Sequence, residues 1–169
     1  MIVVRSGFAS VGFHPLLALL LLLAGLLPRT AMAQRALSIG QHLYLPIYAF
    51  ILHGDLDRSG VARQSPVSTL VSIHNTDPDK PLKVLSARYY STEGKFLRNF
   101  IPSPRILKPM ETLEFLVERR DVTGGSGANF VIQWESEVPV SPPLVQALHA
   151  ELQTNRAIVF TTDAVLIPR

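Results

Sequence analysis

The chain has 169 residues, no cysteine and a formal net charge of +3, from 16 Lys and Arg against 13 Asp and Glu. The absence of cysteine excludes disulfides, thiol chemistry and lipid attachment at a lipobox. The basic residues are scattered, with Arg119-Arg120 as the longest basic run, whereas a nucleic-acid partner would require a clustered basic face. Nucleic acid is therefore not expected as a partner.

Residues 1–33 have the anatomy of a secretory signal peptide. Arg5 supplies a positive n-region, Leu16–Leu27 is a twelve-residue apolar core, and Ala31-Met32-Ala33 is a small-residue cleavage box. Cleavage before Gln34 would leave a single domain with 14 Lys and Arg against 13 Asp and Glu, a net charge of +1. The sequence thus predicts an exported protein, periplasmic or extracellular.

The same segment admits a second interpretation. Residues 6–28 contain no Asp, Glu, Lys or Arg over 23 positions, which is long enough to span a bilayer as an uncleaved membrane anchor. In that case the membrane would be contacted through this N-terminal segment.

After residue 33 the chain reads as short apolar alternations separated by turn signals, the pattern of an all-β protein. Pro46 in the first alternation indicates an edge position or a bulge. Residues 53–66 are polar and predicted as loop, and turns are expected at 75–81, 92–95 and 107–110. The expected strands, in chain order, are 42–52, 67–74, 82–90, 96–101, 112–118, 130–134 and 157–167.

One segment departs from this pattern. Ser141-Pro142-Pro143 offers an N-cap followed by proline in a first helical turn. Leu144, Leu148 and Leu152 then share one helical face. A short helix is therefore predicted near 143–153. The remaining elements predict a two-layer antiparallel β-sandwich, immunoglobulin-like in general architecture, although the Cys-Trp-Cys signature of true immunoglobulin domains is absent.

The segment Arg119–Asn129 contains three glycines. It lacks the lysine and following helix of a phosphate-binding loop, and alanine replaces the last glycine of the nucleophile elbow G-x-S-x-G. A turn between two strands, with glycine at positive φ, is the simplest prediction. The alternative is an anion or ligand loop whose amides form a nest beside the arginines. Its candidate ligand-binding residues are Arg119, Arg120, Gly124, Gly125, Ser126, Gly127 and Asn129.

Asp55, Asp57, Ser59 and Gly60 match the first half of a calcium loop, in which alternate oxygens face one ion. The twelfth position, which should be a bidentate glutamate, is Pro66. Asp55, Asp57 and Ser59 are the candidate metal ligands, beside an ordinary turn as the simpler interpretation. The histidines show no zinc-binding spacing, and nothing local supports a Ser-His-Asp triad. No catalytic residue and no cofactor is predicted.

Several short motifs recur together in a known family. They are His42 to Tyr48 (HLYLPIY), His53-Gly54-Asp55, Ile73 to Pro78 (IHNTDP), Arg88-Tyr89-Tyr90 and Gly124 to Phe130 (GGSGANF). Through them residues 41–160 resemble the bacterial family catalogued as domain of unknown function 3124. The resemblance implies a small, exported, single-domain protein with no assigned activity or ligand, and it assigns no residue a role.

Taken together, the sequence predicts an exported, non-catalytic module of the cell envelope that binds a protein or an envelope polymer through loops or an exposed sheet face. The alternative is a small-ligand, anion or metal-dependent binder or enzyme. It would use the loop of His53, Asp55 and Asp57 or the glycine loop Arg119–Asn129.

Overall fold

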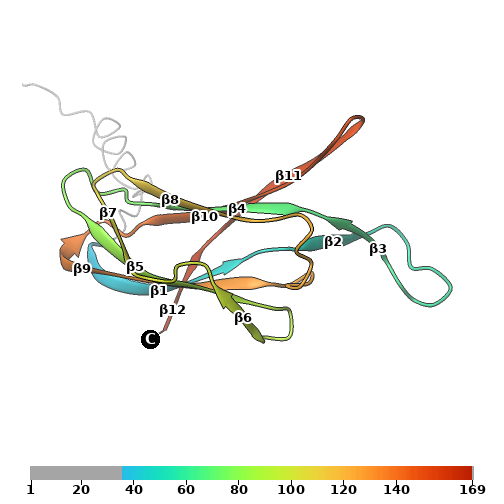
Figure 1. The fold of residues 1–169 in the computed structure, drawn as a ribbon, viewed down its shortest axis with the longest axis horizontal. Coiled ribbons are helices and arrows are strands. Elements are labelled where there is room, and N and C mark those ends of the chain that lie inside the picture. The colour runs from blue at the N-terminus through green and yellow to red at the C-terminus, as the bar shows by residue number, and fades with distance from the viewer. Residues whose placement is uncertain (1–35, 169) are drawn as a thin grey trace, which may run out of the picture. The chain divides into compact units, whose positions relative to one another are not determined.

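The computed structural model describes residues 36–168, which contain twelve strands and no helix (Figure 1). The all-β class is therefore confirmed. In chain order the strands are β1 (Ser38–Pro46), β2 (Phe50–His53), β3 (Arg63–Pro66), β4 (Ser68–His74), β5 (Leu82–Tyr90), β6 (Phe96–Asn99), β7 (Arg105–Leu107), β8 (Thr112–Val117), β9 (Asn129–Val140), β10 (Leu144–Gln153), β11 (Arg156–Asp163) and β12 (Val165–Ile167).

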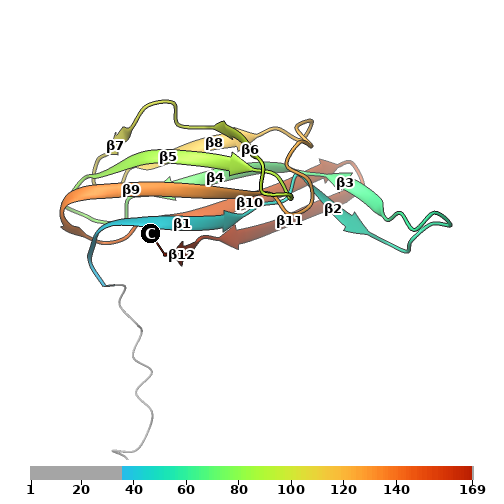
Figure 2. The ribbon, with the colours of Figure 1, turned by 90° about the horizontal axis from the view of Figure 1, so that it is seen from below.

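Two antiparallel sheets face each other; Figure 1 shows the two layers edge-on, and in Figure 2 the sheet of β1, β9 and β5 lies in front of the sheet of β10, β4 and β8. One has the order β12-β1-β9-β5-β6, with β7 also paired to β5; the other has the order β11-β10-β4-β8. Strands β2 and β3 form a separate two-stranded ribbon. β11 and β12 belong to different sheets and are separated by one residue, Ala164, so the chain joins the two layers there. The predicted β-sandwich is confirmed.

The core lies between the layers and follows the alternation of the sequence. Strand β9 buries Phe130, Ile132 and Trp134, and strand β4 buries Val71 and Ile73 from the opposite sheet. Because successive side chains of a strand point to opposite faces, every second residue supplies this apolar layer.

The helix predicted near 143–153 is wrong: these residues form β10, which pairs with β4 and β11. Leu144, Leu148 and Leu152 are spaced by four, and four is a multiple of the strand period as well as one helical turn. The residues between these leucines distinguish a strand from a helix. Val145, Ala147, His149 and Glu151 alternate inward and are all buried.

The polar segment 53–66 is also more ordered than predicted, because Arg63–Pro66 pairs with Phe50–His53 to make the β2–β3 ribbon. The expected strand 42–52 is split into β1 and β2 by residues 47–49. Pro46 is the last residue of β1, beyond the part that pairs with β12, so its missing N–H breaks no bond on that side.

The predicted turns 75–81 and 92–95 are confirmed. Asn75 donates from Nδ2 to the carbonyl of Lys80 at 2.9 Å, and Asp77 accepts the amide of Lys80 at 3.0 Å. Gly94 adopts a φ of 77°, as a tight turn between β5 and β6 requires.

The leader or anchor predicted at residues 1–33 lies outside the described residues. Among residues 36–168 there is no helix that could cross a membrane.

Candidate functional site

The glycine segment connects β8 to β9 and is a turn, as predicted. Gly125 has a φ of 80°. Gly124 lies against Tyr89 so closely that an added Cβ would be 2.0 Å from the tyrosine hydroxyl oxygen. Both positions therefore require glycine for the fold itself, one for its backbone conformation and one for space.

The polar groups of this turn are largely bonded within the protein. The amide of Gly125 donates to the carbonyl of Val122 at 3.2 Å, and the amide of Gly127 donates to Thr92 Oγ1 at 2.9 Å. The carbonyl of Gly124 accepts both the amide and the hydroxyl of Thr92. Two amides of the proposed nest are thus already committed, and the ligand-binding role of the loop stays a prediction.

The remaining predicted members of this loop lie apart. Arg119 is bound to Glu151 on β10, and Arg120 forms an ion pair with Glu118. Ser126 is half-buried in the turn, and Asn129 begins β9. The structure therefore does not direct both arginines toward the glycine amides.

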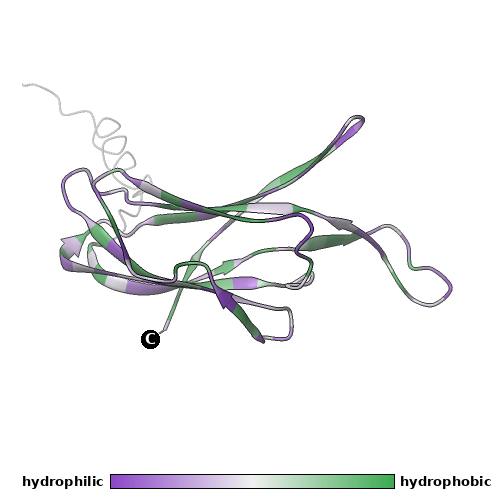
Figure 3. Ribbon diagram, viewed as in Figure 1, coloured by the Kyte–Doolittle hydropathy of each residue, from purple (hydrophilic) through white to green (hydrophobic). Residues whose placement is uncertain are grey.

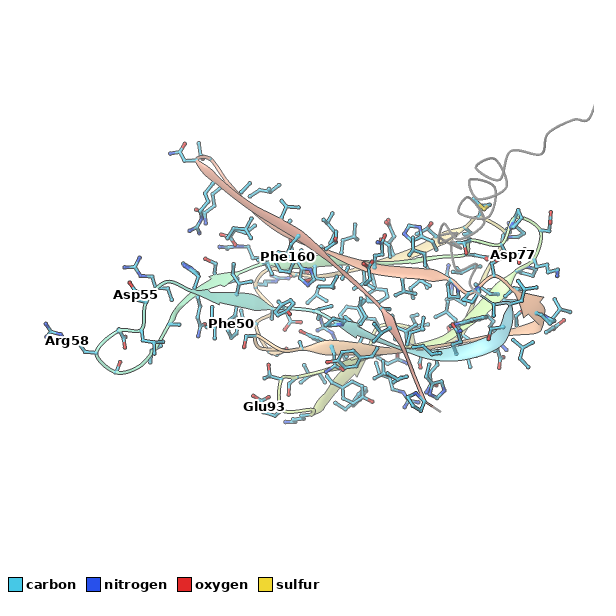
Figure 4. All side chains as sticks on the ribbon, turned by 180° about the vertical axis from the view of Figure 1, so that it is seen from behind. Phe50, Asp55, Arg58, Asp77, Glu93 and Phe160 are labelled. Atoms are coloured by element: carbon cyan, nitrogen blue, oxygen red, sulfur yellow. The ribbon has the colours of Figure 1, made fainter. Side chains whose placement is uncertain are left out.

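The candidate calcium loop forms the tip of the β2–β3 ribbon. In Figure 4, Asp55 and Arg58 mark this outer end, whereas Asp77 lies at the opposite end of the sandwich. One carboxylate oxygen of Asp57 accepts three hydrogen bonds, from the amide and hydroxyl of Ser59 and the amide of Val61, at 2.7–2.9 Å. These bonds, that of the Val61 amide first, lower the pKa of Asp57.

Asp57 thus closes a turn by itself. No cluster of three or more His, Asp or Glu side chains suited to a metal occurs between residues 36 and 168. The metal assignment to Asp55, Asp57 and Ser59 stays a prediction without a closed ligand set.

A buried ion pair that sequence reasoning missed lies on β10. Glu151 is 2% exposed and receives two bonds from Arg119, Nε to Oε2 at 2.7 Å and Nη2 to Oε1 at 2.9 Å. Gln153 also donates to this carboxylate. The Arg119 hydrogen bonds, followed by burial that opposes them, set the pKa of Glu151 below its usual value. A buried carboxylate held by a bidentate arginine fixes the geometry of the surrounding strands.

His149, two residues earlier on β10, is also fully buried. Its ring stacks on Phe160 with centroids 4.4 Å apart, and Tyr48 packs edge-on at 5.7 Å. Nε2 accepts the main-chain amide of Tyr48 at 3.1 Å. Burial lowers the pKa of His149 to about 4, so the imidazole is neutral at pH 7 and able to accept this bond.

These contacts anchor two hairpins that continue past the sandwich (Figure 1). We call residues 50–66 the β2–β3 arm, and residues 151–158 the β10–β11 arm, because β4 pairs with β10 only as far as Ala150. The arms meet at Ser65, whose hydroxyl contacts Arg156 Nη2 at 3.4 Å and His53 Nε2 at 3.0 Å. Among residues 36–168, no carboxylate bonds the other nitrogen of His53, so the Ser-His pair lacks the third group of a catalytic triad.

Large aliphatic side chains are exposed on both arms and on the sheet beside them, and in Figure 3 hydrophobic stretches alternate with hydrophilic ones along both hairpins. The β2–β3 arm exposes Leu52, Leu56 and Val61; Leu152 on the β10–β11 arm is 74% exposed. Leu116, Leu70 and Leu148 are register neighbours across β8, β4 and β10 on the outer face, and Val159 lies beside Ala150 on β11. The arms thus present an apolar surface that the core does not use.

Comparison with known proteins gives a family but no activity. No curated protein matches the chain. A crystal structure described as Thermotoga maritima 1070 aligns with a TM-score of 0.41 and 16% identity over 74% of this chain and 92% of that chain. The model of the family described as protein of unknown function, DUF3124, matches residues 40–167. This match covers most of the sequence and confirms the predicted resemblance, so the chain belongs to the DUF3124 family.

Proposed function

We propose that this protein is an exported, non-catalytic binding module of the cell envelope, whose two arms contact another protein. The observation that carries the proposal is the exposed aliphatic surface on two hairpins whose bases are held by the Arg119–Glu151 pair and the His149–Tyr48 hydrogen bond. Exposed apolar clusters of this kind mark interaction sites in soluble proteins. The alternative partner is an envelope polymer, which would bind through convergent polar groups; the arms also expose Asp55, Arg58 and Arg63 beside their leucines and valine.

The polar groups near the arms support binding rather than chemistry. Glu151, His149 and Ser65 are all buried, and each is bonded to a neighbouring strand or arm. A general acid or base must reach the proton of a substrate, which a side chain buried between packed strands does not do. These groups instead hold the arms in a fixed orientation, which lowers the entropic cost of ordering them on binding.

Export rests on the predicted signal peptide. Mass spectrometry of the protein recovered from the producing cell should give a chain beginning at Gln34. A mass beginning at Met1 would replace the free exported form with a membrane-tethered one, and would leave the binding proposal itself untouched.

Site-directed photo-cross-linking in intact cells tests the binding proposal. A photoreactive amino acid replaces Leu56 or Leu152 at the arm tips, with Arg88 as the control, since it is exposed on the outer face of the other sheet. The arm positions should give adducts of discrete mass that Arg88 does not give, and Leu152→Asp should remove the adduct formed at Leu56. Equal labelling at all three positions would refute the proposal.

A further inference from the structure

The outer edge of β11 offers free main-chain groups in a regular row. β11 pairs with β10 without a register shift from Gln146↔Asp163 to Gln153↔Arg156, and the amide of Ala164 continues this ladder to the carbonyl of Val145 at 3.0 Å. In an antiparallel pair, alternate residues direct both N–H and C=O toward the partner strand. Since Ala164 faces β10, the odd-numbered residues Ala157, Val159, Thr161 and Asp163 direct theirs away from it.

No other described strand pairs with that edge. β11 is eight residues long, and the six between Arg156 and Asp163 carry no charge, proline or glycine. Natural proteins guard free edges with charges, prolines, bulges or short strands. The other long edge of the same sheet, β8, carries Glu114 in its middle, while β12 has three residues and β6 four. An unguarded edge such as β11 is a template for another strand.

The sequence of β11 favours a second copy of itself as that strand. Its two charges have opposite sign and lie at opposite ends, Arg156 and Asp163. In an antiparallel pair of two copies, each charge lies at the end where the second strand carries the opposite charge, although on the other face of the sheet, whereas a parallel pair in register would place like charges side by side on one face. With a two-fold axis at Val159, the two valines face each other and Ala157 faces Thr161 of the second copy. These residues are all uncharged, and the odd-numbered main-chain groups of both strands are then in register.

We propose that two copies of this chain associate through antiparallel pairing of β11 with β11, which joins their four-stranded sheets edge to edge. The interface is isologous, as expected of a closed two-fold dimer. A single pair of edge strands buries less surface than a standard protein interface, so the association is expected to be weak and to depend on concentration. It uses the Val159 edge rather than the arm tips and does not depend on a second binding partner.

The absence of cysteine from the chain permits a clean test. The full chain carrying Val159→Cys is produced, and whole cells are treated with a thiol oxidant, because residues facing each other across an antiparallel pair lie within disulfide range. The matched control is Leu116→Cys, on the same outer face at the opposite edge, with 52% exposure against 56% for Val159. Most of the Val159→Cys protein should migrate at twice the monomer mass on a non-reducing gel, while Leu116→Cys stays monomeric.

A second change checks that strand pairing causes the cross-link. Thr161→Pro, added to Val159→Cys, removes an N–H that points away from β10, so it spares the ladder within the chain and should abolish the dimer band. Should it instead unfold the chain, Thr161→Lys places a charge on the same edge and should also weaken the band. Equal cross-linking of Val159→Cys and Leu116→Cys, or an adduct of another mass at Val159, would overturn the proposal.

Discussion

Arg119 and Glu151 are 32 residues apart in sequence, and their side chains form a bidentate pair that ties the chain after β8 to the base of the β10–β11 arm. The carboxylate is almost completely buried, while the guanidinium side chain is 57% exposed. A buried charge without a partner is strongly unfavourable, so the folded chain keeps Arg119 beside Glu151 on β10. The arm therefore leaves the sandwich in one defined direction.

The first prediction concerns the pH dependence of this anchor. The pKa of Glu151 in the folded chain is depressed, mainly by the Arg119 hydrogen bonds, so its stabilising effect is present above the unfolded pKa near 4.5. It is lost as the pH falls through the folded pKa. Glu151→Gln should destabilise the protein at pH 7. In the parent protein the urea concentration at the midpoint of unfolding should fall as the pH drops below 4.5, and in the variant it should fall less. Glu137→Gln, at an exposed position, should leave that decline intact.

Protonation of His149 should lower the free energy of unfolding in a higher pH range than protonation of Glu151. Its folded pKa of about 4 lies below its usual 6.5, so protonation favours the unfolded chain and stability is lost as the pH falls from 6.5 toward 4. The loss should be on the order of 3 kcal/mol, since a pKa unit is worth about 1.4 kcal/mol and the ring is buried. The glutamine of His149→Gln can still accept the main-chain amide of Tyr48. The free energy of unfolding of this variant, measured with urea, should be nearly constant between pH 7 and pH 5. A slope equal to that of the parent protein would contradict the assignment; His74→Gln serves as the surface control.

Gly124 should be the least replaceable glycine of its turn. In Gly124→Ala the new Cβ would meet the Tyr89 hydroxyl at 2.0 Å and the Ala128 Cβ at 2.7 Å. Overpacking of this kind costs about 1–3 kcal/mol of unfolding free energy. Gly127→Ala is the matched control, because its nearest contact would be Thr92 Cγ2 at 3.3 Å. Equal losses in the two variants, measured by urea unfolding, would show that Tyr89 is not held against Gly124.

The sandwich could be predicted from the sequence because its strands have one buried and one solvated face. Phe130, Ile132 and Trp134 occupy alternate positions with Gln133 and Glu135 on the other face, and Val71 and Ile73 flank Ser72. The β10 segment failed because its leucines, spaced by four, satisfy both periods and lie on the outer face. Its true inward residues include His149 and Glu151, which a hydrophobic pattern does not count as core.

The site could be predicted less well, since its parts come from distant segments. Arg119 was named only as a candidate ligand-binding residue, which stays a prediction, and its partner Glu151 lies on a strand that the sequence indicated as helix. Ser65 joins the arms through Arg156, 91 residues away. Pairings at such separations depend on strand order, and alternation within single strands carries no information on that order.

Two substitutions separate a turn from an active or metal-binding site. Ser126→Ala should leave both stability and cross-linking of the arms unchanged, because Ser126 is only half-buried in the turn. Asp57→Ala removes the acceptor for Ser59 and Val61, so it should increase amide exchange at the tip of the β2–β3 arm and leave the sandwich as stable as before. If Ser126→Ala abolished cross-linking of the arms, the glycine turn would be a functional loop after all.

The most direct test of a non-catalytic, protein-binding module is a thermal-shift screen of the protein as the cell processes it, against divalent metals, oxyanions, nucleotides and envelope sugars. A ligand at one hundred times its dissociation constant would stabilise the folded state by about 2.7 kcal/mol, which such a screen detects. We predict no shift with any of these compounds. A shift with calcium that disappears in Asp57→Ala, or one with phosphate that disappears in Arg120→Ala, would contradict the account and assign a small-ligand site to the corresponding loop.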